Sequence, residues 1–231
     1  MSDSGFQRAR RPEQKQQRRS AILQAAEQLL AEDGVDSVSL SAIARRVGLA
    51  KSNVYRYFES REQIFLTILW DDMVGWADEV ARGLEPLAGH NSAAAASAVI
   101  AEAFAGRQRL CELNSVLSWV LEQNVSEETA LDFKTRTSVL GMAAADALHR
   151  AFPSIPEARC RWVLRLIFAL VAGLWPLTRM SPEVERVLSR PELEDLRLNF
   201  EHELEGAIRA MFYGLQVEAW RKSGRPVGRR E

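Results

Sequence analysis

Apolar residues recur along most of this chain with the 3.6-residue period of an amphipathic helix, and the two-residue alternation of a β-strand occurs nowhere. Breaks in the pattern coincide with helix-capping residues and with Gly or Pro. We therefore expect helices over residues 12–33, 39–47, 51–58, 60–87, 92–105, 107–123, 126–152, 157–177, 182–188 and 191–221. The sequence predicts an all-α fold without internal repeats.

The segment Ser39–Arg61 holds two short helical patterns on either side of Gly48, which permits a tight turn at a positive φ. The first pattern is capped by Ser39 and buries one apolar face, formed by Leu40, Ile43, Ala44 and Val47. The second turns Val54 and Phe58 inward and exposes Lys51, Ser52, Asn53, Tyr55 and Arg56. A small core helix has no folding reason to expose such donors, whereas a helix in the DNA major groove does. The segment predicts a helix-turn-helix whose second helix reads DNA.

At these residues the chain resembles the TetR family of bacterial transcriptional regulators. The matching motifs are Ile43-Ala44, Gly48-Leu49, Lys51–Phe58 and Ser60–Phe65. The resemblance implies a three-helix DNA-binding domain followed by a larger helical domain that binds a ligand and dimerises. One departure is Ala50, which stands where the family usually has Ser or Thr, so that a side-chain cap is missing there and Ser52 is the substitute we consider.

Basic and hydroxyl side chains around this motif are the candidate DNA contacts. We expect Arg56 to pair with a guanine, while Lys51, Tyr57 and Arg61 hold phosphates. The resemblance places backbone contacts at Arg18 and Arg19, which could equally form a solvated face. The predicted DNA-binding residues are Arg18, Arg19, Ser39, Ser41, Lys51, Ser52, Asn53, Tyr55, Arg56, Tyr57 and Arg61.

The charge of the chain is unevenly distributed. Residues 1–61 contain 11 basic and 7 acidic residues, against 19 and 24 in the remainder. This balance suits a DNA-binding head on a body that is not held to phosphate, although ordinary fluctuation would also produce it. Arg8, Arg10 and Arg11 form a basic arm that either follows the DNA backbone or minor groove or is simply a disordered tail.

The sequence gives little support for a disulfide framework, a metal site or an enzyme active site. Cys111 and Cys160 are too few for a disulfide framework and lack metal-ligand spacing, so we interpret both as buried and reduced. The three histidines are scattered, and no phosphate loop or nucleophile motif is present. We expect no enzyme activity, cofactor or metal. The polar first 19 residues and the lack of an uninterrupted ~20-residue apolar span predict a cytoplasmic protein rather than a membrane protein.

The last two long predicted helices, 157–177 and 191–221, are unusually apolar. Ala169 and Gly173 on the first, with Gly206 and Gly214 on the second, would let another helix approach closely. The resemblance implies that these helices pair with their symmetry mates in a four-helix bundle. The homodimer would then place two heads on half-sites of a pseudo-palindromic double-stranded operator, ~34–36 Å apart. The alternative is that both helices pack only within one subunit.

The body also carries the large aromatics from which helical proteins build ligand pockets. All six Trp residues lie beyond the helix-turn-helix. The candidate residues lining a small-molecule effector site are Trp70, Met73, Trp76, Phe104, Asn114, Ser118, Trp119, Met142, Trp162, Phe168 and Trp175. Arg107 and His149 are further polar candidates, while plain core packing explains each Trp equally simply.

These observations predict a DNA-binding domain over residues 1–60, an effector-binding and dimerisation domain over 61–221, and a disordered basic tail over 222–231. The helix expected from Ser60 to Leu87 links head and body, so that tilting it would move the head. We expect a dimeric repressor that a small apolar or aromatic ligand releases from its operator. The alternative is a ligand-independent DNA-organising or global regulatory protein with the same head.

Overall fold

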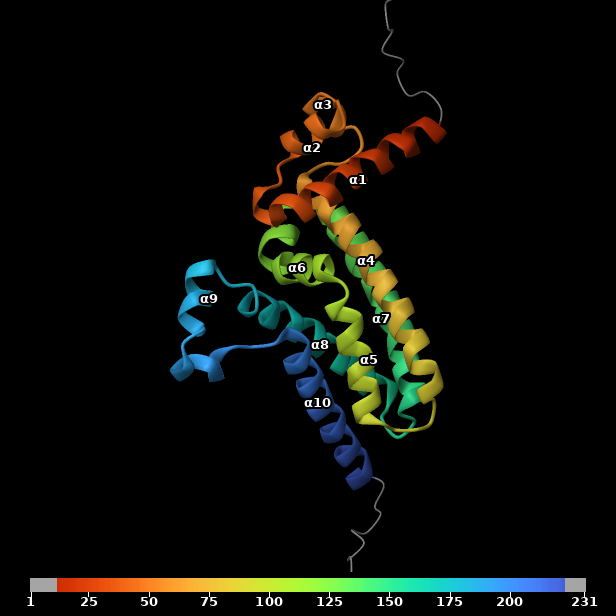
Figure 1. The fold of residues 1–231 in the computed structure, drawn as a ribbon. Coiled ribbons are helices and arrows are strands. Elements are labelled where there is room, and N and C mark those ends of the chain that lie inside the picture. The colour runs from red at the N-terminus through yellow and green to blue at the C-terminus, as the bar shows by residue number, and fades with distance from the viewer. Residues whose placement is uncertain (1–11, 223–231) are drawn as a thin grey trace, which may run out of the picture.

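The computed structural model describes residues 12–222, and within this range helices and their connections account for every residue, without a β-strand. The expected all-α fold, with a helix-turn-helix head and a larger helical body, is confirmed. Figure 1 shows the head at one end of an elongated bundle. The predicted basic arm and all of the predicted tail except Lys222, which ends the last helix, lie outside the described residues.

The head consists of α1 (Pro12–Ser37), α2 (Leu40–Arg46) and α3 (Lys51–Val54). The Oγ atom of Ser39 accepts a hydrogen bond from Ala42 N at 3.1 Å and so caps α2, as its sequence position predicts. Gly48 has φ +66° in the turn between α2 and α3, a conformation that side chains with a Cβ rarely adopt. The turn predicted from this glycine is therefore confirmed.

One helix end in the head agrees with the prediction and one differs. Gly34, with φ +72° and ψ 170°, interrupts α1 directly after Asp33, where the sequence predicts the helix end, and a further helical turn then continues to Ser37. Helix α3 ends at Val54, and hydrogen-bonded turns carry the chain on to Phe58, with Phe58 N donating to Val54 O at 3.1 Å. The same residues still lie on one helical arc because these turns keep a helix-like curvature.

The body is built on two long helices that run side by side, α4 (Arg61–Leu84) and α7 (Glu127–Ala151) (Figure 1). The short η1 (Glu85–Leu87) follows α4, and α5 (Ala93–Ala105) packs against α4 and the last helix. Ser60 and Ser126 cap α4 and α7 through their Oγ atoms, which accept from Gln63 N and Thr129 N. Since α4 begins in the head and ends in the body, it connects the two without a break.

Helix α6 (Gln108–Val116) lies between the head and α8 (Glu157–Leu177). The sequence predicted one helix over residues 107–123, but the chain changes to a π-helix over Leu117–Leu121 and to the 3₁₀ turn η3 over Glu122–Asn124. A π-helix widens the turn and rotates side chains out of the α-helical register. This change places Trp119 on the surface, with 62% of its area exposed.

The prediction that the last helix begins at residue 191 is wrong. The segment after α8 forms the short α9 (Pro182–Leu188) and the 3₁₀ helix η4 (Pro191–Leu196), and α10 begins only at Phe200 and ends at Lys222. The carboxamide of Asn199 accepts from His202 N at 2.9 Å, so that a new helix starts there. Leu196, which lies within the helix predicted over residues 191–221, is instead part of η4 and is 61% exposed.

One hydrophobic core extends from the head into the body. Its centre in the body is an aromatic cluster of Trp76, Phe104 and Phe168, whose ring centroids lie 4.8–5.2 Å apart. Helix α8 is long and apolar enough to cross a membrane by length and composition alone. In the fold it packs against α6, α7 and α10, as the core helix of a helical bundle does.

Candidate DNA-binding surface and head–body junction

The polar face of α3 points away from the protein. Val54 and Phe58 are buried in the head, while the side chains on the opposite arc are exposed or, for Asn53, half-buried. The exposed residues are Lys51, Ser52, Tyr55 and Arg56. Arg56 forms no ion pair with any of the described residues, and Lys51 Nζ lies 5.8 Å from the centroid of the Tyr55 ring. The arc predicted to read DNA therefore keeps its donors available to a partner.

The start of α3 lacks a side-chain cap, as Ala50 predicted. Ala50 is extended, with φ −67° and ψ 144°, and only its carbonyl takes part, accepting from Asn53 N at 2.8 Å. Ser52 is exposed and gives no capping bond within the described residues. The first turn of α3 is therefore held by its backbone and by the burial of Val54.

Some arginines of the head contact other side chains of the protein, and others form no ion pair among the described residues. Arg46 binds the Glu32 carboxylate through two hydrogen bonds of 3.1 and 2.6 Å, and Arg19 stacks on Phe58 with its Cζ 4.8 Å from the ring centroid. Arg18 and Arg45 are exposed and form no ion pair in the described chain. Arg45 is therefore a further candidate DNA contact that the sequence prediction did not include, although its position on the last turn of α2, shortly before Gly48, is a usable signal.

Arg61 points into the head. Its Nη1 donates to Val38 O at 2.9 Å, its Nε and Nη2 donate to Glu62 Oε1 at 3.0 and 2.9 Å, and its Cζ lies 5.4 Å from the Phe65 ring centroid. This arrangement fastens the start of α4 to the loop before α2. The predicted phosphate contacts of Arg61 and of half-buried Tyr57 stay predictions, as do the predicted DNA contacts of Ser39, whose Oγ caps α2, and of exposed Ser41.

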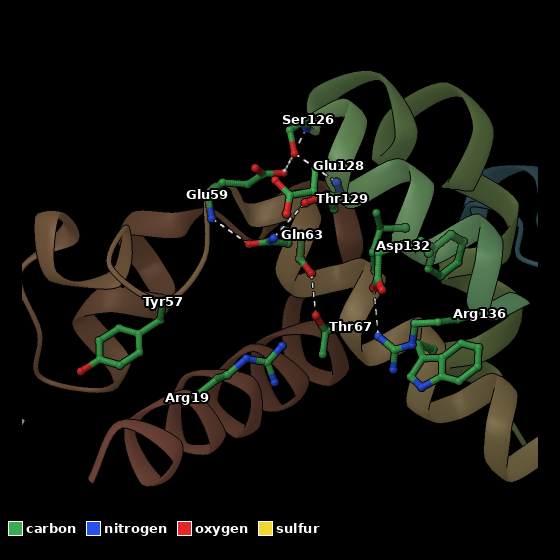
Figure 2. Close-up of a pocket in the computed structure, with 13 residues that line it drawn as sticks. Arg19, Tyr57, Glu59, Gln63, Thr67, Ser126, Glu128, Thr129, Asp132 and Arg136 are labelled. Atoms are coloured by element: carbon green, nitrogen blue, oxygen red, sulfur yellow. Dashed lines mark hydrogen bonds and ion pairs between the residues drawn. The ribbon is translucent and has the colours of Figure 1, made fainter. Parts of the chain in front are cut away.

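Figure 2 shows one side of the junction between head and body, a pocket of about 340 Å³ lined by α1, α4 and α7 together with the α3–α4 turn. The Glu59 carboxylate accepts from Ser126 N at 3.0 Å and Ser126 Oγ at 3.1 Å. Gln63 Nε2 donates to Thr129 Oγ1 at 3.0 Å. The hydrogen bonds that Glu59 accepts, led by the one from the Ser126 backbone N–H, lower its pKa. Together with the Gln63–Thr129 bond they join the turn after α3 and the start of α4 to the start of α7.

The other side of the junction joins the head to α6. Val35 N donates to Glu112 Oε1 at 3.0 Å, and Arg109 binds Asp72 through two hydrogen bonds of 2.8 and 2.7 Å. Arg109 also lies 3.6 Å from Glu27 of α1. The hydrogen bonds to Asp72 raise the pKa of the Arg109 guanidinium, which is therefore charged at any working pH. A movement of α6 would act directly on the head through Glu112 and Arg109.

The predicted effector-binding residues fall into different environments. Met73, Trp76, Phe104 and Asn114 are buried, with Phe168 packed beside them; Asn114 Nδ2 donates to Phe168 O at 2.9 Å, while the indole N–H of Trp76 has no partner in the described structure. Trp70 and Trp162 are half-buried beneath Arg136 and Arg159, whose Cζ atoms lie 4.3 and 4.2 Å from the ring centroids. Ser118, Trp119 and Met142 are exposed, Trp175 is buried, and Trp119 and Trp175 line one groove together. The ligand role of every one of these residues stays a prediction.

The two remaining polar candidates have structural partners. Arg107 Nη2 donates to Gly75 O at 2.9 Å and pairs with Glu79, and His149 Nδ1 contacts Ile155 O at 2.8 Å. Cys111 and Cys160 are buried and unpaired, and burial raises their thiol pKa values to about 12 and about 11. Neither thiol is a reactive thiolate near neutral pH.

A helix-turn-helix that displays an unpaired polar arc, joined by a continuous helix to an all-helical body, defines a DNA-binding transcriptional regulator. Residues 22–68 match the family described as bacterial regulatory proteins, tetR family, and residues 71–219 match the tetracyclin repressor-like C-terminal domain. The chain therefore belongs to the TetR family of transcriptional regulators, which are not enzymes.

Curated relatives match about a third of the chain. The HTH-type transcriptional regulators Rv1816 of Mycobacterium tuberculosis and Mb1846 of Mycobacterium bovis are each 34% identical over 73 residues, or 32% of this chain. The alignment spans 31% of the length of each of these relatives.

Solved structures match most of the chain at low sequence identity, which shows the fold alone. A TetR-family regulator from Streptomyces coelicolor is 18% identical, with a TM-score of 0.54 over 86% of this chain and 99% of that one. FadR from Thermus thermophilus in complex with lauroyl-CoA is 17% identical, with a TM-score of 0.57 over 92% and 99%. RolR in complex with resorcinol is 16% identical, with a TM-score of 0.57 over 96% and 100%.

Proposed function

We propose that this regulator is a cytoplasmic, dimeric repressor that binds a pseudo-palindromic operator and leaves it when a small apolar or aromatic ligand binds the body. The observation that carries this function is the outward polar arc of α3, because Ser52, Tyr55 and Arg56 are exposed while Val54 and Phe58 hold the helix in place. Residues 1–60 would bind DNA and residues 61–221 would bind the effector and the second subunit.

Exposed apolar stripes on α8 and α10 support a dimer. On α8 the exposed residues recur at helical spacing, at Leu166, Ala169, Gly173 and Leu177. On α10 the corresponding stripe is Ala210, Tyr213, Gly214 and Val217. A Cβ added at Gly173 or Gly214 would meet no atom within 4 Å, so these positions leave room for helices of a second subunit. Packing the stripes around a two-fold axis would cover them.

Each polar side chain of α3 and of the turn that follows it, residues 51–57, has a proposed role. Arg56 would pair with a guanine edge in the major groove, with Ser52, Asn53 and Tyr55 beside it. Lys51 and Tyr57 would hold phosphates, assisted by Arg18 and Arg19. Arg45, on the last turn of α2, is added to the residues proposed to contact phosphates, because it is exposed and forms no ion pair within the described residues.

Ligand response would act through the junction between head and body. Glu112 and Arg109 hold the head from α6, and Glu59 and Gln63 hold it from α7. A ligand that binds better when these bonds are rearranged would shift the spacing of the two heads and lower DNA affinity. The lauroyl-CoA and resorcinol complexes of similarly folded regulators support a small-molecule effector for this chain.

The base-reading role is tested with Arg56→Ala. We expect it to weaken binding to the operator by about 1–3 kcal/mol while changing binding to random-sequence duplex far less. Arg45→Ala is the matched control, since loss of a phosphate contact weakens both duplexes alike. The operator itself is obtained by selection from a random duplex pool. Equal losses on both duplexes for Arg56→Ala would remove Arg56 from base recognition.

Genome-wide mapping of bound sites tests the regulatory role. A local repressor would occupy few sites, and the genes beside them would indicate the chemistry of the effector. Occupancy of many unrelated sites, unchanged by any compound that binds the body, would instead indicate a DNA-organising protein. Such a result would leave the role of α3 intact and overturn the ligand-released repressor.

A further inference from the structure

A groove of about 730 Å³ lies between the head, α6 and α8, outside the aromatic core of the body. Its walls are the turn at Val35 and Asp36, the exposed side of α6 with the π-helix that follows it, and the C-terminal half of α8. This volume falls within the ~300–1,000 Å³ of known small-molecule sites. It is therefore large enough for a ligand of one or two fused rings.

An exposed aromatic face borders the groove. Trp119 belongs to the π-helix Leu117–Leu121, and its Nε1 donates to Ser115 O at 3.0 Å, which fixes the indole while 62% of it stays exposed. Exposing a Trp costs hydrophobic burial, and π-helical turns are frequent at functional sites because they give up regular hydrogen bonding. Trp119 is therefore positioned as a stacking surface rather than as core.

Arg179, which follows the end of α8, places a cation at the same groove. The guanidinium of Arg179 lies 4.4 Å from the centroid of the Trp175 ring and pairs with no carboxylate among the described residues. Stacking on the indole orients the guanidinium and leaves its edge donors available to an anion. The acidic groups of the groove, Asp36 and Glu112, lie on its head and α6 walls. An anionic ligand would therefore direct its charge toward Arg179.

We propose that this groove binds a planar aromatic carboxylate, with its ring against Trp119 and its carboxylate on Arg179. The inference rests on the proposed ligand-released repressor and gives that ligand a location and a chemical class. Glu112 lines the groove and accepts the backbone N–H of Val35, so a ligand there displaces the very side chain that joins α6 to the head. Binding in the groove thereby weakens the link on which the head depends.

The test uses 2-naphthoate as the probe and uncharged 2-naphthamide as its matched control, with binding to the full-length protein measured by calorimetry. Arg179→Gln is expected to weaken 2-naphthoate binding about tenfold, as loss of a partly exposed charge-assisted hydrogen bond predicts, and to leave 2-naphthamide unchanged. Trp119→Ala is expected to weaken both compounds. Arg136→Gln, which removes the similar Arg on Trp70, is the control and should change neither.

Two results would contradict the proposal that the groove binds an aromatic carboxylate. One is no 2-naphthoate binding at millimolar concentration, and the other is equal affinity in the wild type and in Arg179→Gln. A duplex-binding assay on the same samples separates this failure from failure of the proposed function. If the protein binds DNA but not 2-naphthoate, only the proposed ligand site in the groove is contradicted. If the protein has no affinity for any duplex at low salt, the proposed repressor function is contradicted. If the wild type binds both 2-naphthoate and the duplex, adding 2-naphthoate should lower the duplex affinity of the wild type but not that of Arg179→Gln.

Discussion

The head and the body of this regulator use their distinctive side chains in opposite ways. On α3 and the turn that follows it, the polar residues Ser52 and Arg56 are exposed. In the body the large aromatics Trp76 and Phe104 are almost wholly buried against each other. Exposed donors on a small helix therefore indicate function, whereas an aromatic at helical spacing indicates first of all a core.

The same contrast holds inside the body. Trp76 is 2% exposed in the aromatic cluster, whereas Trp119 is 62% exposed beside the groove. The two residues were equal candidates in the sequence, because each follows a helical apolar pattern. Only the packing of α6 and the change to a π-helix separate them.

The largest effect is expected at Trp76. Trp76→Ala would leave a large cavity between α4, α5 and α8 and destabilise the fold by about 3–5 kcal/mol, measured by urea denaturation. Trp76→Phe keeps most of the apolar volume and removes the unpartnered indole N–H, so its cost should be far smaller. Trp119→Ala should change stability by less than about 1 kcal/mol because the indole is mostly exposed. Similar stability losses for Trp76→Ala and Trp119→Ala would contradict the contrast.

A smaller effect is expected at the α6 link. Glu112→Ala leaves the N–H of buried Val35 without an acceptor, which should destabilise the protein by about 1–3 kcal/mol. Glu112→Gln retains an acceptor oxygen and should be close to the wild type. Thermal unfolding with and without operator measures both variants. Equal melting temperatures for Glu112→Ala and the wild type would show that this link does not hold the head.

The next effect concerns affinity rather than stability. Lys51→Ala should weaken operator and random duplex equally, by roughly 1 kcal/mol, and reduce the slope of log affinity against log salt by about 1, because one phosphate contact is lost. Fluorescence anisotropy over a series of salt concentrations gives both quantities. An unchanged slope would exclude Lys51 from phosphate contact.

Much of the fold followed from local signals. Ser39, Gly48 and Ser60 mark helix ends through interactions with residues three or four positions away, so the head was predictable from sequence. The start of α10 at Phe200 was not, since it depends on Asn199 forming a new cap within a pattern that looks continuously helical. The π-helix was also missed, because tertiary packing and not helix propensity selects it.

The candidate site shows the same division. The outward polar arc follows from the four-residue spacing of Val54 and Phe58, because this spacing places both apolar side chains on one face of a helix. The inward bonds of Arg61 depend on Val38 O, which lies 23 residues earlier and cannot be inferred from periodicity. Likewise, Glu112 is an unremarked surface acid in the sequence until the fold brings Val35 N to it. Long-range hydrogen bonds are the part of the site that sequence patterns leave open.

The smallest effect is expected at the Glu59 link. Hydrogen bonds from Ser126 lower the pKa of Glu59 below its ordinary value of 4.5, so its stabilisation is present above about pH 4.5 and is lost as the pH falls through the lowered folded-state pKa. Because the carboxylate is exposed, we expect less than about 0.5 kcal/mol. Glu59→Gln should flatten the acid side of the stability profile slightly, and unfolding midpoints from pH 6 to pH 3 would reveal it. A steeper acid side in the variant would contradict the direction.

The most direct test of the account is the selection of a random duplex pool by the purified protein at low salt, repeated with Arg56→Ala. We predict that the wild type enriches a pseudo-palindrome with two half-sites about one helical turn apart, and that the variant loses sequence preference within the half-sites while still retaining DNA. No retention of any duplex by the wild type, or the same enriched sequence from the variant, would contradict the claim that the exposed arc of α3 reads DNA.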